Sequence, residues 1–382
     1  RYRERENHIS SDSWPIYISL QKDGILFKMR RTQDLPDKES ATMFFQDCKL
    51  AHQAQITGIS HSVKEILPPD LLDLTQLQKE ANIRYGFTAS EVYDIAQSLY
   101  EKKLISYPRT SSRYLTEDVL DSLSPIMARL LSWELFPAAK GTGGIDISSL
   151  SRHVINAEKA NVHHAIIITG IRPGNMSEKE MQVYRLVAGR MLETFMAPCR
   201  IETTNVEAVC AAQHFKAEQT RIIEAGWHDV FMRSDMVPKS GYSVNELPEV
   251  EKSDTLNVCG CNMVHKKQLP VNPFTDAELV EYMEQNGLGT VSSRTNIIRT
   301  LVNRKYIRYS GKYIVPTPKG MFTYETIRGK KIADTSLTAD WEKQLAGLES
   351  GMITGQDFLN RIRTLAKEMT DDIFNTYSTK EE

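Results

Sequence analysis

The 382-residue sequence contains only five cysteines, and no two of them form a C-x-x-C pair. This spacing excludes a zinc ribbon, and the five do not make an even disulfide framework, so a reducing compartment is expected. No apolar run approaches the roughly 20 residues that a membrane span needs, so no membrane partner is expected. Asp-x-Asp is also absent, which leaves no visible source in this chain for a magnesium site, and no metal ligand is predicted.

A strong overall charge is missing too, because the formal net charge is −2. This value excludes a chain that is basic throughout, yet a local basic surface can still bind nucleic acid. One stretch, residues 285–324, contains no acidic residue and seven basic ones, which favours contact with phosphates. The alternative is a solvated basic face without a ligand. The seven basic residues are Arg294, Arg299, Arg304, Lys305, Arg308, Lys312 and Lys319.

Extended and helical patterns alternate along the chain. Residues 14–29 predict a β-hairpin with a type I′ turn at Asp23-Gly24, and residues 55–66 continue the extended pattern. Helices are predicted after the capping box Thr88-x-x-Glu91 and over 179–196. Residues 140–151 are rich in glycine and serine and predict a flexible loop, whereas 201–232 are again β-rich. Because β elements lie on both sides of a helical middle, we expect one domain to be inserted in another.

The last third has the outline of a winged helix. A capping box at Thr275-x-x-Glu278 begins one helix, residues 293–307 form a second, and a hairpin is predicted about Ser310-Gly311. Helix, turn, helix and hairpin in this order are typical of DNA-binding modules. A winged-helix regulator without catalysis, which would prefer specific duplex DNA, is therefore one possible function. A purely structural partner-binding protein, with no affinity for nucleic acid, is another.

The segment "SYPRTSSRYL" (106–115) contains the chemistry of a covalent phosphate reaction. In extended backbone, Tyr107 and Arg109 share a face, so both side chains could meet one phosphate. The phenol becomes a nucleophile when nearby cations favour phenolate, and arginine stabilises charge that develops on the phosphate. By spacing alone the pattern is weak, because Tyr-Pro is also common in turns.

Two further segments contain residues suited to phosphate. In "VHHAIIITG" (162–170), His163 could hydrogen-bond a scissile phosphate or move a proton, although a polar start to a buried segment fits equally. Thr290, Ser293 and Arg294 lie where the second C-terminal helix begins, and hydroxyls at a positive helix end suit a phosphate. Plain N-capping by serine is the alternative for this turn.

Taken together, five ordered motifs resemble the type IA DNA topoisomerases, closest to the topoisomerase III subgroup. "LISYPRTSSRYL" is similar to the active-site tyrosine segment, and "VHHAIIITG" to a histidine segment, with Val162 and Ile168 as departures. The stretch "FTDAELVEYMEQNGLGTVSSRTNIIRTLVNRKYI" resembles the family's helix pair. "PTPKG" and "LTADWEKQLAGLESG" resemble its later markers. The resemblance covers nearly the whole chain in the family's order.

The resemblance implies that Tyr107 is the nucleophile that forms a 5′-phosphotyrosyl link, that Arg109 assists at the phosphate, and that His163 contacts the cleaved strand. Thr290, Ser293 and Arg294 match the DNA-contacting turn. The implied function is ATP-independent cleavage, strand passage and religation of single-stranded or negatively supercoiled DNA, by relaxation or decatenation. A monomer, a helicase partner and a cytoplasmic, nucleoid-associated location are expected. Ser111 replaces an acidic residue that is common in the family.

The family's Toprim domain, which would hold Mg²⁺, precedes the matched region and is absent from this sequence. The chain is therefore expected to bind DNA without completing the reaction alone. The implied fold is a mostly helical, multidomain α+β torus with a β-rich arch and winged-helix-like helical domains. The expected divisions are 1–16, start of the base; 17–66, first part of the arch; 67–175, the helical tyrosine domain; 176–255, second part of the arch; and 256–382, the helical DNA-binding base.

Overall fold

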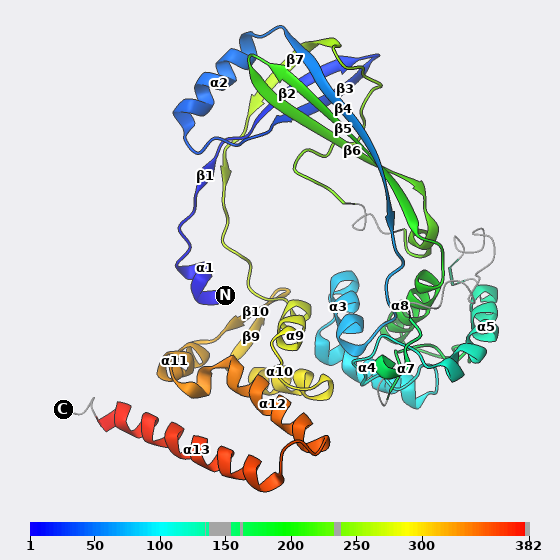
Figure 1. Cartoon of the computed structure of the whole chain (residues 1–382), viewed down its shortest axis with the longest axis vertical. Helices are drawn as coiled ribbons and strands as arrows, with labels where there is room; N and C mark the ends of the chain where they lie inside the picture. The colour runs from blue at the N-terminus through cyan, green and yellow to red at the C-terminus, as the bar shows by residue number, and fades with distance from the viewer. Residues whose placement is uncertain (134, 137–153, 161–162, 233–237, 379–382) are drawn as a thin grey trace.

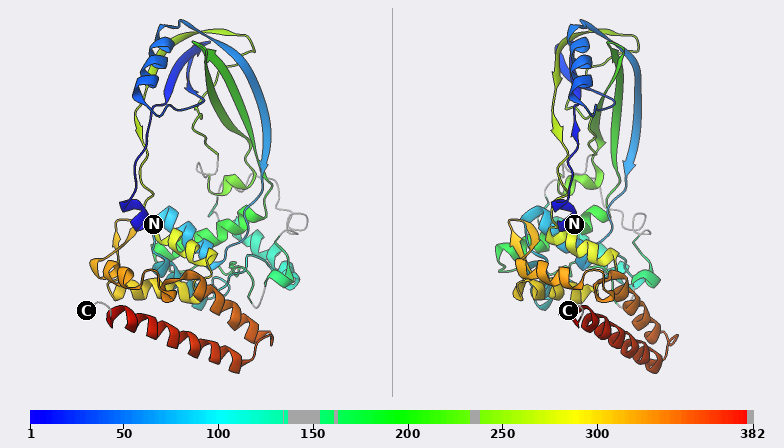
Figure 2. Two further views of the ribbon diagram at one scale, coloured as in Figure 1. Left: turned by 60° about the vertical axis from the view of Figure 1, so that its left-hand side comes forward. Right: turned by 90° about the vertical axis from the view of Figure 1, so that its left-hand side faces the viewer.

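In the computed structural model, the elements are arranged around a ring (Figure 1). A β-barrel lies at one end of the ring, and two groups of helices lie side by side at the other, as the turned views also show (Figure 2). The structure describes residues 1–382 except 134, 137–153, 161–162, 233–237 and 379–382. The loop predicted at 140–151 lies outside the described residues.

The barrel is closed, and its strands follow the order β2-β3-β6-β5-β4-β7 with antiparallel pairing throughout. Alternate residues of β2, among them Ile16, Ile18 and Leu20, are fully buried, as expected for a strand with one face on a core. The hairpin predicted about Asp23-Gly24 is confirmed, because both residues have the positive φ (52° and 83°) of a type I′ turn. The barrel strands are β2 (Ile16–Lys22), β3 (Ile25–Arg31), β4 (Gln53–Ile66), β5 (Cys199–Cys210), β6 (Gln213–Glu224) and β7 (Thr255–Met263).

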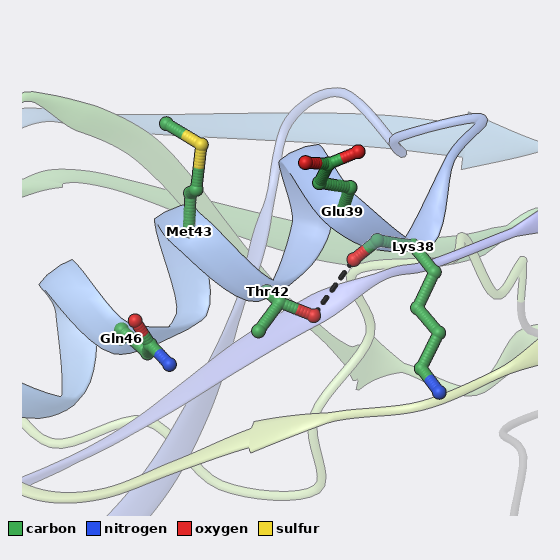
Figure 3. A pocket seen from close by; sticks show the side chains of 5 residues that line it. All are labelled: Lys38, Glu39, Thr42, Met43 and Gln46. Atoms are coloured by element: carbon green, nitrogen blue, oxygen red, sulfur yellow. Dashed lines mark hydrogen bonds between the residues drawn. The ribbon is translucent and has the colours of Figure 1, made fainter.

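One helix on the barrel, α2 (Lys38–Leu50), was not anticipated from the sequence. It begins where the Asp37 carboxylate accepts from the backbone N–H of Ser40 (2.7 Å), and it buries Ala41 and Cys48 against the barrel. Figure 3 shows its opposite face, where five side chains surround a hollow of about 390 Å³. There the Thr42 hydroxyl donates to the carbonyl of Lys38 (2.7 Å). The residues around the hollow are Lys38, Glu39, Thr42, Met43 and Gln46.

The barrel is connected to the helical groups by long strands on one side of the ring and by a two-stranded neck on the other (Figure 1). The neck pairs β1 (Asp12–Ser13) with β8 (Lys266–Lys267). At the lower end of the long strands, the short 3₁₀ helix η3 (Gly226–Val230) anchors them. The indole N–H of Trp227, which is 1% exposed, donates to the carbonyl of Ile66 (2.9 Å). This bond joins the end of β4 to the helical core.

The first helical group contains the tyrosine segment. Its helix α4 begins with the predicted capping box of Thr88 and Glu91, and α8 begins with a second box. Residues 178–194, which the sequence placed in the second part of the arch, pack here in the same hydrophobic cluster as α3 and α4. The helices are α3 (Leu74–Tyr85), α4 (Ala89–Glu101), α5 (Glu117–Ser132), α7 (Ala157–Ala160) and α8 (Glu178–Thr194).

The second helical group contains the predicted helix pair and hairpin, and the capping box of Thr275 and Glu278 is confirmed. The N-terminal helix α1 (Tyr2–Glu6) joins this group through the ion pair of Arg3 with Glu325. Ion pairs join the two groups. In one of them, Nζ of Lys79 lies 2.7 Å from Oε1 of Glu281. The elements are α9 (Asp276–Gln285), α10 (Val291–Asn303), β9 (Ile307–Ser310), β10 (Tyr313–Pro316), α11 (Pro318–Ile327), η5 (Lys331–Ala333), α12 (Thr335–Glu349) and α13 (Gly355–Ser378).

We predict that Gly226→Ala destabilises the junction between the strands and the helical group. Gly226 has a positive φ of 52°, and an added Cβ would meet the carbonyl oxygens of Ala197 and Pro198, which are backbone atoms and cannot turn away. The expected cost is about 2 kcal/mol or more, seen as a thermal midpoint several degrees lower by circular dichroism. Gly174→Ala is the control, because nothing lies within 4 Å of a Cβ there. Equal midpoints for both variants would contradict the prediction.

Candidate active site

Tyr107 lies in an extended segment directly after α4, and hydrogen bonds attach this segment to residues 163–169. The backbone N–H of Ser106 donates to the carbonyl of Ile167 (2.8 Å). The Ser106 hydroxyl donates to the carbonyl of Ala165 (3.1 Å) and accepts from the N–H of Ile167 (3.0 Å). Ile105 and Ile168 form a β-bridge, and both are buried in the core of the helical group. The apolar run after His163 therefore serves as the inner partner of the tyrosine segment.

This pairing brings His163 against Tyr107. The centroids of the two rings are 4.4 Å apart, and the planes are inclined by 43°. The His163 side chain is exposed, whereas Tyr107 is half-buried. The hydroxyl of Thr110 donates to the backbone carbonyl of His163 (2.9 Å), which fixes that residue from the tyrosine segment itself. The structure thus places together two of the residues that the sequence singled out.

Arg109 and Tyr107 both contact the same face of α4. Its Nη2 donates to Oε1 of Gln97 (3.1 Å), and its guanidinium carbon lies 5.0 Å from the centroid of the Tyr93 ring. Tyr107 meets α4 one turn further on, where the Tyr100 ring stands edge-on to it at 5.5 Å. These three α4 residues were not identified from the sequence. Their i, i+4, i+7 spacing in a helix that leads into the tyrosine was the available signal.

Arg113 has a structural partner. Its Nε lies 2.6 Å from Oδ2 of Asp73, which is 1% exposed and also accepts from the N–H of Gln76 (2.7 Å) at the start of α3. Burial raises the pKa of the Asp73 carboxyl, while the Gln76 N–H and the Arg113 charge oppose that rise. The positive charge of Arg113 is therefore engaged by a buried carboxylate. The side chain of Ser111 is exposed.

Thr290, Ser293 and Arg294 lie where α10 begins, in the second helical group. The hydroxyl of Ser293 accepts from the N–H of Thr290 (2.8 Å), as in a capping box. Arg294 is 8% exposed, and it pairs with Glu284 (3.2 Å). Nη1 of Arg294 also lies 3.4 Å from the hydroxyl of Thr75 in α3, and Val291 packs against the core of the first helical group. Further along α10, Arg299 pairs with Asp94 in the middle of α4 (2.8 Å). The start of α10 therefore contacts the helical group that contains Tyr107, and the role of these three residues stays a prediction.

The basic stretch 285–324 divides into neutralised and exposed parts. Arg294 and Arg299 pair with carboxylates that lie outside the stretch. Four other basic side chains are exposed on the turn after α10 and on the β9–β10 hairpin, where they form a basic surface. This hairpin surface consists of Arg304, Lys305, Arg308 and Lys312.

Within the part of the chain that the structure describes, no group of three or more histidine, cysteine, aspartate or glutamate side chains is placed to hold a metal ion. The described residues near Tyr107 therefore do not form a fitting magnesium site. Among the same residues, no helix combines the length and apolar character needed to cross a membrane.

Comparison with known proteins identifies the family. A family model described as DNA topoisomerase matches residues 1–360. The chain belongs to the DNA topoisomerase family. It is 31% identical to DNA topoisomerase 3 of Bacillus licheniformis over 344 residues, covering 84% of this chain and 47% of that protein. It is 30% identical to DNA topoisomerase 3 of Bacillus subtilis over 355 residues, covering 86% and 48%.

These topoisomerase relatives confirm the resemblance to type IA enzymes of the topoisomerase III kind. The fold matches full-length topoisomerase I from Thermotoga maritima with a TM-score of 0.74 at 22% identity, covering 97% of this chain and 60% of that one. At this identity the match shows the fold alone, namely the type IA torus with its barrel and helices. The chain spans about half the length of the curated topoisomerases that it matches.

We predict an acid-sensitive contact at the end of α4, between Glu180 of α8 and Lys102. Hydrogen bonds from Lys102, from the N–H of Ser177 and from the Ser98 hydroxyl lower the pKa of Glu180 from 4.5 to about 2. A lowered carboxyl pKa stabilises the fold above about pH 4.5, and that stability is lost as the pH falls toward 2. Glu180→Gln should therefore lower the thermal midpoint at pH 7 and flatten its fall in acid.

The measurement is the thermal midpoint at intervals from pH 7 to pH 2. Glu178→Gln is the matched control, because that carboxylate lies two residues earlier in α8 and accepts from Gln182 (3.4 Å). The control should keep the parent's dependence on acid. The prediction is wrong if Glu180→Gln and the parent have parallel curves throughout.

Proposed function

We propose that the full-length protein containing this chain is an ATP-independent type IA topoisomerase, with Tyr107 as its nucleophile. The observation that supports this best is the contact between Tyr107 and His163, 4.4 Å between ring centroids, with Arg109 on the same face of α4. A phenol, an imidazole and a guanidinium are groups suited to a phosphotyrosyl reaction. The family relationship supports the same conclusion.

In the proposed reaction, Oη of Tyr107 attacks a DNA phosphorus and the bond from phosphorus to the 3′-oxygen breaks. The phenol loses its proton, the 3′-oxygen gains one, and the 5′-phosphate stays on the tyrosine. Arg109 stabilises the charge on the phosphate oxygens, and His163 contacts the cleaved strand and supports proton transfer. Religation reverses these changes. One phosphodiester exchanges for another, so no nucleotide has to be hydrolysed.

DNA would follow the helical groups of the ring. We propose single-stranded or negatively supercoiled DNA as the substrate, and the exposed hairpin surface suits its phosphates. Thr290 and Ser293 are proposed to contact the backbone, because their hydroxyls and N–H groups lie at a helix N-terminus. For Arg294, contact with DNA requires its pair with Glu284 to open. Four further expectations stay predictions. They are Mg²⁺ held outside this chain, a helicase partner, a monomeric state, and a cytoplasmic, nucleoid-associated location.

A non-catalytic DNA-binding module is the alternative, and the hairpin surface favours it. The order α9, α10, β9 and β10 with exposed basic side chains on the hairpin supports winged-helix-like DNA binding without using Tyr107. The two functions differ in the preferred DNA, because the module would prefer a specific duplex and the topoisomerase single strands.

Covalent trapping tests the proposed nucleophile. The full-length protein, its Tyr107→Phe variant and a Tyr114→Phe control are mixed with 3′-labelled single-stranded DNA and Mg²⁺, and the reaction is stopped with denaturant. We expect label on the parent and on the control, and none on Tyr107→Phe. DNA labelled at the 5′ end should leave no label on the protein, because the link retains the downstream fragment.

Either of two outcomes would contradict the proposal. Label on Tyr107→Phe would show that another residue is the nucleophile. No label on the parent, together with tight binding to duplex DNA, would favour the non-catalytic module.

A further inference from the structure

Arg109 differs from Arg113, Arg294 and Arg299 in the partner that holds it. Arg113, Arg294 and Arg299 each lie against a carboxylate. The Nη2 of Arg109 donates to the neutral amide oxygen of Gln97 (3.1 Å). Within the described part of the chain, the ion pairs include none that involves Arg109. An amide acceptor orients a guanidinium without cancelling its charge, so Arg109 keeps a full positive charge beside Tyr107.

The other contacts of Arg109 restrict it in the same neutral way. Its guanidinium lies over the face of Tyr93, 5.0 Å from the ring centroid, and a ring face attracts the cation without neutralising it. Gln97 is itself oriented, because its Nε2 donates to Oε1 of Glu101 (2.8 Å), which leaves its oxygen directed at Arg109. The Glu101 carboxylate thus acts on the amide and does not pair with the arginine.

One buried donor of Arg109 lacks a partner. Its Nε is buried and has no hydrogen-bond partner among the residues that the structure describes. A buried N–H without a partner is costly, and such groups are rare unless a ligand or water completes them. A phosphate oxygen bound beside Tyr107 would supply the missing acceptor.

We propose that Gln97 and Tyr93 are positioning residues that hold Arg109 oriented and fully charged for the phosphate attacked by Tyr107. This inference rests on the proposed function and adds to it two residues of α4 that contact Arg109. They act through Arg109, so their effect on the reaction depends on the guanidinium being present.

The test is a double-mutant cycle in the full-length protein. Gln97→Met keeps the length of the side chain and removes the amide. The rates of covalent-complex formation and of religation are measured on 3′-labelled single-stranded DNA for the parent, Gln97→Met, Arg109→Ala and the double variant. We expect Gln97→Met to slow both steps about tenfold or more, with DNA affinity by fluorescence anisotropy within about twofold of the parent.

The Arg109→Ala background separates positioning from general structure. There, Gln97→Met should slow the reaction by less than about twofold further, because the group that it positions has gone. A merely structural glutamine would slow both backgrounds alike, and that result would overturn the inference. A rate for Gln97→Met within about twofold of the parent would also overturn it. Gln182→Met is the matched control, a helical glutamine bonded to a glutamate one turn away, and should keep the parent's rate.

Two further variants test the neutrality of the contacts and keep the inference testable if Gln97→Met fails to fold. Gln97→Glu keeps an acceptor for Arg109 but adds a negative charge, so both steps should also be at least about tenfold slower than in the parent. If the rates equal those of the parent, an uncharged partner for Arg109 is not required. Tyr93→Phe keeps the ring face and the parent's rate, whereas Tyr93→Leu should be slower. Equal rates for these two variants overturn the role of Tyr93.

Failure of the inference and failure of the proposed function give different results. If Tyr107→Phe still forms a covalent complex, the proposed nucleophile is wrong, and the positioning role inferred for Gln97 and Tyr93 fails with it. If Tyr107→Phe is inactive while the Gln97 and Tyr93 variants behave as the parent does, the topoisomerase function stands and only the positioning role is lost.

Discussion

The hydrogen bonds of Ser106 hold the candidate active site together. They join its backbone and hydroxyl to Ala165 and Ile167, across a sequence separation of 61 residues between Ser106 and Ile167. Closing so long a loop costs chain entropy, and the burial of Ile105, Ile166 and Ile168 offsets that cost. Because the paired segments are part of the core, the rings at their surface ends stay in register. The contact between Tyr107 and His163 depends on this pairing.

A second constraint is the distribution of charge around α4 and α10. Carboxylates neutralise Arg113, Arg294 and Arg299; the pairs of Arg294 and Arg299 attach helices to one another, and that of Arg113 attaches the tyrosine segment to the start of α3. The basic side chains of the hairpin surface remain exposed, and Arg109 is held by an amide and a ring. Positive charge is thus compensated where the fold is assembled and left available where phosphate is proposed to bind. This division explains how a chain with a net charge of −2 can suit DNA.

The two helical groups close the ring through polar and apolar contacts. Lys79 pairs with Glu281, and Gln78 donates to the hydroxyl of Thr295 (2.9 Å). The side chain of Ala89 lies in the apolar cluster of the second group, and Val291 of α10 packs against the cluster of the first. Both kinds of contact therefore hold the groups together. The barrel has a separate hydrophobic cluster, whereas Cys199 and Ile201 at the start of β5 belong to the cluster of the first helical group.

The sequence by itself determined the elements that depend on local chemistry. The turn at Asp23-Gly24, the capping boxes at Thr88 and Thr275 and the order of helices and strands follow from side chains within a few residues of each other. The ordered motifs also indicated the family, because their residue types are specific. Helix α2 was not anticipated, and the domain boundaries and the roles of the site residues stay predictions.

The tertiary structure alone decided which charges are free and which side chains meet. No local pattern shows that Arg294 is compensated by Glu284 on another helix, or that Arg109 lies between Gln97 and Tyr93. Such partners are chosen by how helices pack after the chain has folded back over tens of residues. Spacing along the chain can place residues on one face of an element, but it cannot say what that face will touch.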